Sequence, residues 1–331
     1  MIENNKKCVV NDILNDELNK LSLNNSIKKG DIPSPLIKWV GGKSQIIDTI
    51  FKMIPKDINN YYEIFVGGGS VLIMILWAKN NDYINIRGDI NVYDLNDGLI
   101  GLYNNIKLKK NKLYKKIKKL KDEFSKCDAN GIVNRKPENI EDAKTSKESY
   151  YYWIRKLYNN EKDKSNIDSS AYFVFLNKTG FRGMYREGPN GFNIPYGNYK
   201  NPKIIEKTHL EYLSELFKDV NFKKNDFSES LKDIKDKNNF LYFDPPYAPE
   251  NSKSFVGYTK DGFNIEQHKK LFNLIKEISK DNMIMLSNSN VDLVRDNMLE
   301  KDYKYKVLSC KRSINSKNPS SKTEEVIITN Y

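Results

Sequence analysis

The sequence predicts an α/β protein with a doubly wound, mainly parallel sheet and an inserted, mostly helical region. Short apolar runs typical of strands alternate with helical periodicity between residues 61 and 95 and again after Pro202. This alternation is typical of βαβ units, whose ligands bind at the carboxyl ends of the strands. The pattern is interrupted between about Lys107 and Pro202, where we expect the insertion.

The first βαβ elements follow an extended segment, Pro35–Val40, and a Gly-Gly turn. A periodic run over Ile46–Ile54 predicts a helix stopped by Pro55. A strand is expected at Tyr61–Val66, then a three-glycine turn and a helix with Ser70 as its N-cap. The next strand is expected at Ile90–Leu95.

The αβ pattern resumes after the insertion. The expected elements are a helix at Glu206–Phe217, strands at Val220–Lys223 and Phe240–Phe243, a helix at Ile265–Ser279, and a strand at Met283–Ser287. Two antiparallel strands joined by a polar loop are expected at the end of the chain.

These patterns divide the chain into three parts. Residues 1–33 are predicted to form a polar tail with one short helix around Asn11–Leu23. Residues 34–104 and 203–331 would form the ligand-binding domain, and residues 105–202 an inserted domain that ends in a hairpin. The basic run Lys107–Lys121 is predicted to be a solvated helix face.

Charge and composition limit the classes of function. The chain has 331 residues, with 55 basic against 43 acidic side chains and a net charge of +12. Such an excess favours a polyanionic partner such as nucleic acid. Only seven basic residues are arginine, however, and Lys, Asn, Ile and Tyr are all abundant, so compositional bias is the alternative explanation.

The cysteines and histidines exclude several classes of site. Cys8, Cys127 and Cys310 fit neither a disulfide framework nor a zinc finger, which indicates a reducing compartment. With only His209 and His268, a Ser-His-Asp triad, an HExxH site and a zinc deaminase centre are disfavoured, and we expect no metal. We also find no signal peptide and no apolar stretch long enough to span a membrane, so a soluble intracellular protein is expected.

Two glycine motifs could approach phosphates or cofactors. FVGGGS, Phe65 to Ser70, places glycines between a strand and a helix, where backbone can contact a ligand; a simple tight turn is the alternative. Leu72 stands where a dinucleotide fingerprint requires glycine. GGKS, Gly41 to Ser44, is similar to the end of a phosphate-binding P-loop. Ile37 stands where that motif requires its first glycine, so a P-loop is excluded.

DPPY, Asp244 to Tyr247, is the strongest motif. Two prolines fix the backbone, so that the Asp244 carboxylate and the Pro245 carbonyl can both accept hydrogen bonds from one amino group. Tyr247 offers a face on which a planar base can stack, a contact worth roughly 1–3 kcal/mol. Pro246 completes the rigid corner. The alternative is an ordinary strand end followed by a Pro-Pro turn.

Taken together, four motifs resemble the Dam-type DNA adenine-N(6) methyltransferases, of the α group of amino methyltransferases. They are IKWVGGK, FVGGGS, LNKTGFRGMYREGPNGFNIPYGNY (Leu176 to Tyr199) and DPPYAPENSKSFVGYTKDGF (Asp244 to Phe263). The resemblance covers roughly Pro35 to the C-terminus. It implies a Rossmann-like methyltransferase fold, S-adenosyl-L-methionine as cofactor and double-stranded DNA as partner, with no membrane.

The resemblance also implies roles for residues of the cofactor site. Trp39 and Lys43 would touch the cofactor, Phe65 to Gly69, including Gly67, would wrap it, and Asp226 with Phe227 would hold its adenine. One acidic residue would bind the ribose hydroxyls, and Asp89 and Asp94 compete for that role. We favour Asp94, because the following LIGLYN keeps the family's spacing.

On the DNA side, the resemblance implies that the target adenine is flipped out of the duplex. Phe181 would wedge into the base stack, Arg186 and Lys38 would contact guanines, and Arg182 is expected at a phosphate. GATC is the expected site, and a cognate restriction endonuclease acting separately is a possible partner. The alternatives are methylation of adenine in RNA and a nucleic-acid-binding protein that keeps the fold without turnover.

Overall fold

The computed structural model describes residues 30–249, 263–299, 303–311 and 322–331. Within them, the central sheet has seven strands in the order β10-β11-β9-β8-β2-β4-β7. Their bounds are β2 Tyr61–Glu63, β4 Ile90–Asp94, β7 Val220–Lys224, β8 Phe240–Phe243, β9 Met283–Ser289, β10 Lys304–Lys311 and β11 Lys322–Thr329. The strands from β9 to β7 pair in parallel, and β11 joins β9 and β10 antiparallel. The predicted α/β fold with a mainly parallel sheet is therefore confirmed.

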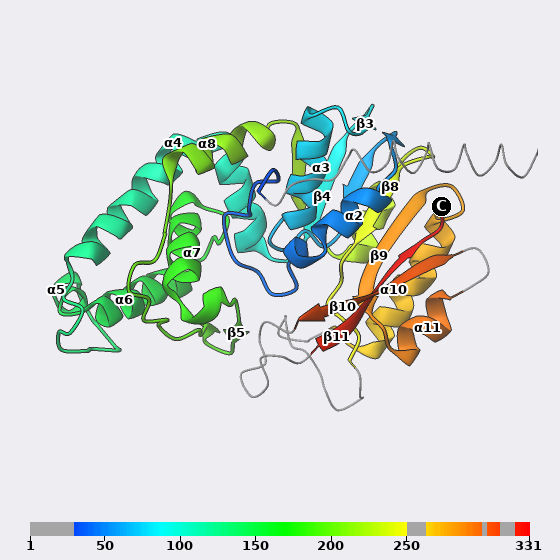
Figure 1. Ribbon diagram of the computed structural model, residues 1–331. Helices are drawn as coiled ribbons and strands as arrows, with labels where there is room; N and C mark the ends of the chain where they lie inside the picture. Colours follow the sequence, from blue (N-terminus) through cyan, green and yellow to red (C-terminus); the bar gives the residue numbers. More distant parts are fainter. Residues whose placement is uncertain (1–29, 250–262, 300–302, 312–321) are drawn as a thin grey trace, which may run out of the picture.

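Helices cover both faces of this sheet (Figure 1). One face carries α2 (Ile47–Met53), α3 (Ser70–Asn80) and α8 (Lys207–Leu216), and the other carries α9 (Phe227–Ser230), α10 (Ile265–Ile278) and α11 (Asp292–Met298). Successive strand residues alternate between the two hydrophobic clusters: Tyr61 packs in the first and Tyr62 in the second. A sheet buried on both faces needs continuous apolar strands, and all four residues of β8 are buried.

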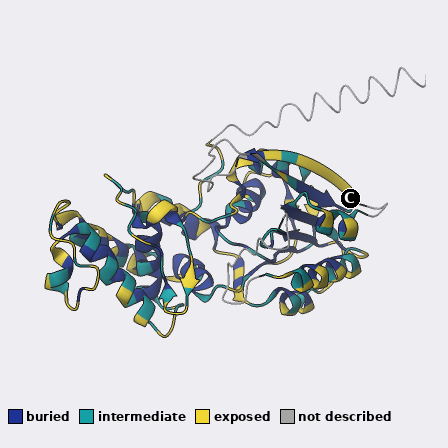
Figure 2. Ribbon diagram, turned by 90° about the horizontal axis from the view of Figure 1, so that it is seen from below, coloured by how far each residue is buried: buried dark blue, intermediate teal, exposed yellow. Residues whose placement is uncertain are grey.

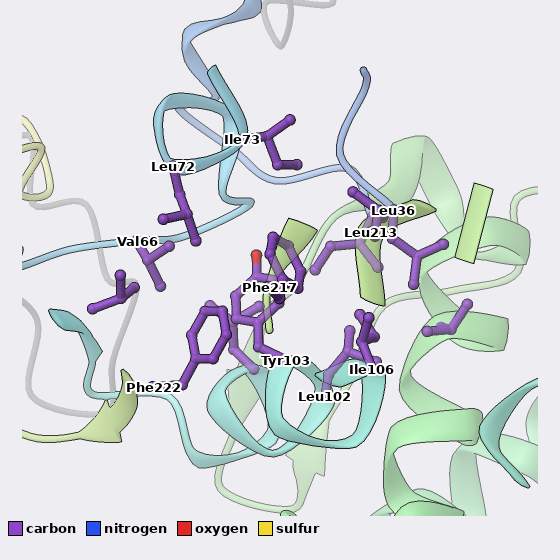
Figure 3. Packing of buried hydrophobic residues seen from close by; sticks show 14 of the residues in the cluster. Leu36, Val66, Leu72, Ile73, Leu102, Tyr103, Ile106, Leu213, Phe217 and Phe222 are labelled. Atoms are coloured by element: carbon purple, nitrogen blue, oxygen red, sulfur yellow. The ribbon is translucent and has the colours of Figure 1, made fainter. Parts of the chain in front are cut away.

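The first face is packed with aromatic rings around Tyr103 (Figure 3). The ring of Tyr103 stacks on Phe222 with centroids 5.1 Å apart and meets Phe217 edge-on at 5.7 Å. Its hydroxyl donates a hydrogen bond of 2.7 Å to the carbonyl of Gly67. The core thus holds the glycine turn that follows β2.

A helical lobe extends from the sheet (Figure 1), and its ribbon carries buried residues between the helices and exposed residues on the outer surface (Figure 2). It contains α4 (Asp97–Lys126), α5 (Ile140–Lys144), α6 (Lys147–Asn160), α7 (Ile167–Thr179) and the hairpin of β5 (Glu187–Gly188) and β6 (Gly191–Phe192). Helix α4 crosses the predicted boundary at residues 104 and 105, with non-helical dihedral angles at Lys109. The hydrophobic core is continuous from the sheet into this lobe.

Most expected elements are present, and two local predictions are wrong. Strand β2 ends at Glu63, not Val66, because the chain bends at Ile64, three residues before the first glycine of the turn. Ser70 does not cap α3: Gly69 holds the N-cap position with φ 75°, and the Ser70 Oγ instead accepts a hydrogen bond from the backbone N–H of Lys43. The predicted helix at Asn11–Leu23 and the loop between β10 and β11 lie outside the described residues. The described residues contain no helix that is long and apolar enough to cross a membrane.

Candidate active site

The carboxyl ends of β2, β4 and β8 meet at one edge of the sheet, beside a cavity of about 1210 Å³. This is the position at which open α/β sheets bind their ligands. The predicted site residues that line the cavity are Trp39, Phe65, Gly67, Asp94, Asp226, Phe227, Asp244, Pro245, Pro246 and Tyr247. A single cavity therefore brings the glycine turn and the DPPY corner together.

Asp244 is paired with Lys43 at the base of this cavity. The Lys43 Nζ lies 2.6 Å from Asp244 Oδ2 and donates a hydrogen bond of 2.5 Å to the carbonyl of Gly41. The Lys43 side chain is only 3% exposed and that of Asp244 18%. Burial raises the pKa of Asp244 to about 6, although the ammonium of Lys43 opposes this rise. The carboxylate is thus mostly ionised at neutral pH.

Tyr247 lies next to the same pair. The Nζ of Lys43 is 4.9 Å from the centroid of the Tyr247 ring, within the range of a cation–π contact. Burial raises the pKa of the Tyr247 phenol, so the hydroxyl stays protonated and can donate a hydrogen bond. The chain after Tyr247 is fixed by Asn288, whose side-chain oxygen accepts from the backbone N–H of Ala248 at 2.9 Å.

The glycine turn is built on Asp94 and Trp39. Asp94 Oδ2 accepts from the backbone N–H of Gly67 at 3.0 Å, and burial raises the pKa of this carboxyl. Gly67 has φ +48°, and a Cβ there would lie 2.8 Å from Cδ1 of Trp39. Only glycine therefore fits between Trp39 and the turn. Asp89, the competing acid, precedes the amino end of β4, at the far end of the strand from Asp94.

An aromatic wall lies beyond this turn. The rings of Phe65 and Phe227 stack with centroids 6.0 Å apart, and Phe263 meets Phe65 edge-on at the same distance. Asp226 caps α9 by accepting from the backbone N–H of Ser228 at 2.9 Å. The wall gives the cavity a flat apolar surface beside a carboxylate.

The four residues predicted to contact DNA lie outside the cavity lining, on the hairpin side of the site. Phe181 is 44% exposed, and Arg182 beside it adopts a left-handed conformation with φ 56°. Arg186 donates from Nε to the Asn193 side chain at 2.7 Å. Lys38 is exposed and reaches toward the Tyr199 ring, 5.6 Å from its centroid.

One buried amide, the side chain of Asn177, joins Lys38 to the turn at Phe181–Gly183. The Asn177 side chain accepts from the backbone N–H of Lys38 at 2.9 Å and donates to the carbonyl of Lys38 at 2.8 Å. It also donates to the carbonyl of Gly183 at 2.9 Å. Lys38 and the Phe181–Gly183 turn are therefore held at fixed positions relative to each other.

Comparison with known proteins decides the family. Residues 39–314 match the model of the D12 class N6 adenine-specific DNA methyltransferases, which is most of the chain. The chain belongs to this family. It is 35% identical over 309 residues to Type II methyltransferase M.MjaIII of Methanocaldococcus jannaschii, covering 90% of this chain and 99% of the relative. It is also 30% identical over 292 residues to the DNA adenine methylase of Haemophilus influenzae, covering 88% and 90% of the two chains.

This methyltransferase has a third buried acid at the site, which the sequence did not predict. Glu63, at the end of β2, is 2% exposed, lines the cavity and accepts from the Tyr61 hydroxyl at 2.8 Å. Its pKa is raised well above the ordinary value by burial, and the charges of Asp244 and Asp94 add to the rise. The available signal was an acid at the carboxyl end of a strand, four residues before Gly67. Asp244, which directly follows β8, was identified from a similar position.

Other missed residues come from distant parts of the methyltransferase. Tyr185 stacks on Trp39 with ring centroids 5.3 Å apart, so the lobe contributes to the cavity wall together with Lys164. Glu325, in β11, also lines the cavity. Nothing in the local sequence around these residues indicates that they reach the site.

Two of the residues predicted to contact the cofactor, Lys43 and Gly69, are not among those that line the cavity. Lys43 is buried against Asp244, as described above, and Gly69 faces the Tyr103 hydroxyl, 3.1 Å from where a Cβ would stand. Their predicted contacts with a cofactor stay predictions.

Proposed function

We propose that this DNA adenine methyltransferase uses S-adenosyl-L-methionine to methylate the N6 amino group of an adenine flipped out of double-stranded DNA. The observation that carries the proposal is the Asp244 carboxylate, fixed by Lys43 beside the Pro-Pro corner and in one cavity with the glycine turn. That arrangement supports bringing an amino group and a methyl donor together in line, which is the main demand of this reaction.

The residues present fit the cofactor. S-adenosyl-L-methionine carries a positively charged sulfonium and an ammonium, and the cavity is lined by the acidic side chains of Glu63, Asp94 and Asp244. Burial raises the pKa of Glu63, and a bound cation would lower it again. Asp94 would bind the ribose hydroxyls, as acids do in related sheets, while Phe227 and Asp226 would hold the adenine. The tight contact of Gly67 with Trp39 leaves backbone, not side chain, at the cavity surface. When bound, the cofactor supplies an electrophilic methyl group.

Asp244 would orient and activate the target amine. Its Oδ2 is paired with the ammonium of Lys43. Its Oδ1 and the Pro245 carbonyl oxygen would therefore accept hydrogen bonds from the two N–H groups of the amine. Two acceptors favour the pyramidal nitrogen, whose lone pair can attack. Tyr247 would stack on the flipped base. Proton loss to the ionised Asp244 would follow methyl transfer.

The lobe and its hairpin would recognise DNA. Phe181, which is 44% exposed, would fill the gap left by the flipped adenine. Arg186 and Lys38 would contact guanines, with GATC as the site, and Arg182 a phosphate. The lobe, residues 105–202, would then be the target-recognition domain. Relatives named Type II methyltransferases support a cognate restriction endonuclease that acts separately.

The test is to incubate the purified protein with unmodified genomic DNA and S-adenosyl-L-methionine, and to map methylated adenines by sequencing. We expect modification at GATC, and little incorporation into a matched RNA duplex. Asp244→Ala should abolish methylation while calorimetry still detects cofactor binding. Methylation at other sequences would refute the site assignment. A folded Asp244→Ala variant that loses methylation and cofactor binding equally would contradict the role of Asp244.

A further inference from the structure

The Tyr247 hydroxyl is held by a residue from the C-terminal hairpin. It donates a hydrogen bond of 2.9 Å to Oε2 of Glu325, which lies 78 residues later in the chain. Both residues line the cavity. A hydrogen bond to a charged acceptor is stronger than a neutral one, so this contact can fix the orientation of the ring.

Glu325 itself is placed by rigid elements. In β11 it pairs with Ser289 of β9 on one side and Leu308 of β10 on the other. A carboxylate in the middle of a three-stranded ladder moves little, which suits a residue that sets the position of another. Glu325 also lies beyond the span of the family match, which ends at residue 314.

We propose that Glu325 is a positioning residue for the methyl transfer, because it holds the Tyr247 ring in the plane where the target base stacks. This inference rests on the function proposed above. Without the carboxylate, the ring can rotate about its side-chain bonds, and the base loses its fixed support next to Asp244. A structural role confined to the sheet would not depend on the hydroxyl of Tyr247.

Glu325 also acts on Asp244 through its charge. Its carboxylate raises the pKa of Asp244, in addition to the larger effect of burial. Removing the charge while keeping an oxygen acceptor should therefore lower the pKa of Asp244. Within the part of the chain that the structure describes, the ionisable groups around Asp244 are Lys43, Glu63, Tyr242, Tyr247 and Glu325. The Glu325→Gln variant removes the charge of Glu325 and leaves the other four groups unchanged.

The experiment measures single-turnover methylation of duplex DNA by Glu325→Ala, Tyr247→Phe, the double variant and Glu325→Gln. We expect Glu325→Ala and Tyr247→Phe each to slow methyl transfer about tenfold, the loss expected when a hydrogen bond to a charged group is removed. The double variant should be no slower than either, and the KM for the cofactor, measured separately at steady state, should change less than about twofold. Glu325→Gln should keep most of the rate but shift the acidic limb of the pH–rate profile to lower pH. Glu215→Gln, an exposed surface carboxylate paired with Lys218, is the control.

Two results would overturn the inference: a wild-type rate in Glu325→Ala, or losses that multiply in the double variant. A wild-type protein that methylates no DNA would instead refute the proposed function. In that case, ring resonances of Tyr247, assigned with Tyr247→Phe in carbon-13 tyrosine-labelled protein, still test the contact. In Glu325→Ala these resonances should change their chemical shift, or the signals of the two sides of the ring should merge as the ring rotates faster. Unchanged resonances would overturn the inference that Glu325 fixes the ring.

Discussion

Replacing Lys43 with methionine should move the pH at which the enzyme loses activity. Lys43 and Asp244 form a buried pair, with Nζ and Oδ2 2.6 Å apart. Methionine keeps the length of the side chain but not its charge. In the proposed mechanism Asp244 accepts hydrogen bonds from the amine in its ionised form, so the wild-type rate should fall as pH drops through about 6, the pKa of this carboxyl.

The size of the shift follows from the cost of leaving a buried charge unpaired. Removing one partner of a buried ion pair costs about 3 kcal/mol or more, and each pKa unit corresponds to about 1.4 kcal/mol. The pKa of Asp244 should therefore rise by about two units. At pH 7 the ionised fraction would fall from about nine-tenths to about one-tenth, and the rate would fall about tenfold. The fold should survive, since the acid can bind a proton instead of remaining charged.

The assay is the pH–rate profile of single-turnover methylation at saturating cofactor, with saturation checked by calorimetry. Lys43→Met should be slow at pH 7 and recover most of the wild-type rate near pH 9. Lys52→Met, which removes an exposed lysine of α2, should keep the wild-type profile. If the acidic limb of Lys43→Met stays near pH 6, Lys43 does not control the ionisation of Asp244.

Two other perturbations test the DNA side and the core. Arg186→Ala should relax specificity at one guanine, with a loss of about 1–3 kcal/mol in discrimination measured by competition between GATC and single-mismatch duplexes; unchanged discrimination would exclude a guanine contact. His268 is buried, neither ring nitrogen has a hydrogen-bond partner among the described residues, and burial lowers its pKa to about 4. The unfolded chain therefore binds this proton first as pH falls below about 6.5, and urea unfolding should show a loss of up to about 3 kcal/mol between pH 6.5 and pH 4. His268→Leu should remove that loss, and His209→Gln should not. If the free energy of unfolding depends on pH equally in wild type and His268→Leu, His268 is not the group responsible.

Local patterns were enough to predict most of the sheet. Strand β8 was expected at Phe240–Phe243 and is found there, since a run of four large apolar residues fits a strand that is buried on both faces. The helix boundaries of α8 and α10 also agree with the sequence to within one residue at each end. The N-cap of α3 was predicted wrongly because serine is a common N-cap residue. In the structure the Ser70 hydroxyl instead accepts a hydrogen bond from the backbone N–H of Lys43, which lies in a different segment.

The sequence by itself determined the fold class and placed the DPPY corner and the glycine turn at the ends of strands, because both follow from periodicity and turn chemistry over a few residues. The tertiary structure decided which charges face each other. Lys43 meets Asp244, and Glu325 meets Tyr247, only because the order of the strands brings the beginning, middle and end of the chain to the same edge of the sheet. Local composition carries no information about such contacts, and the pKa of a buried carboxylate depends on them.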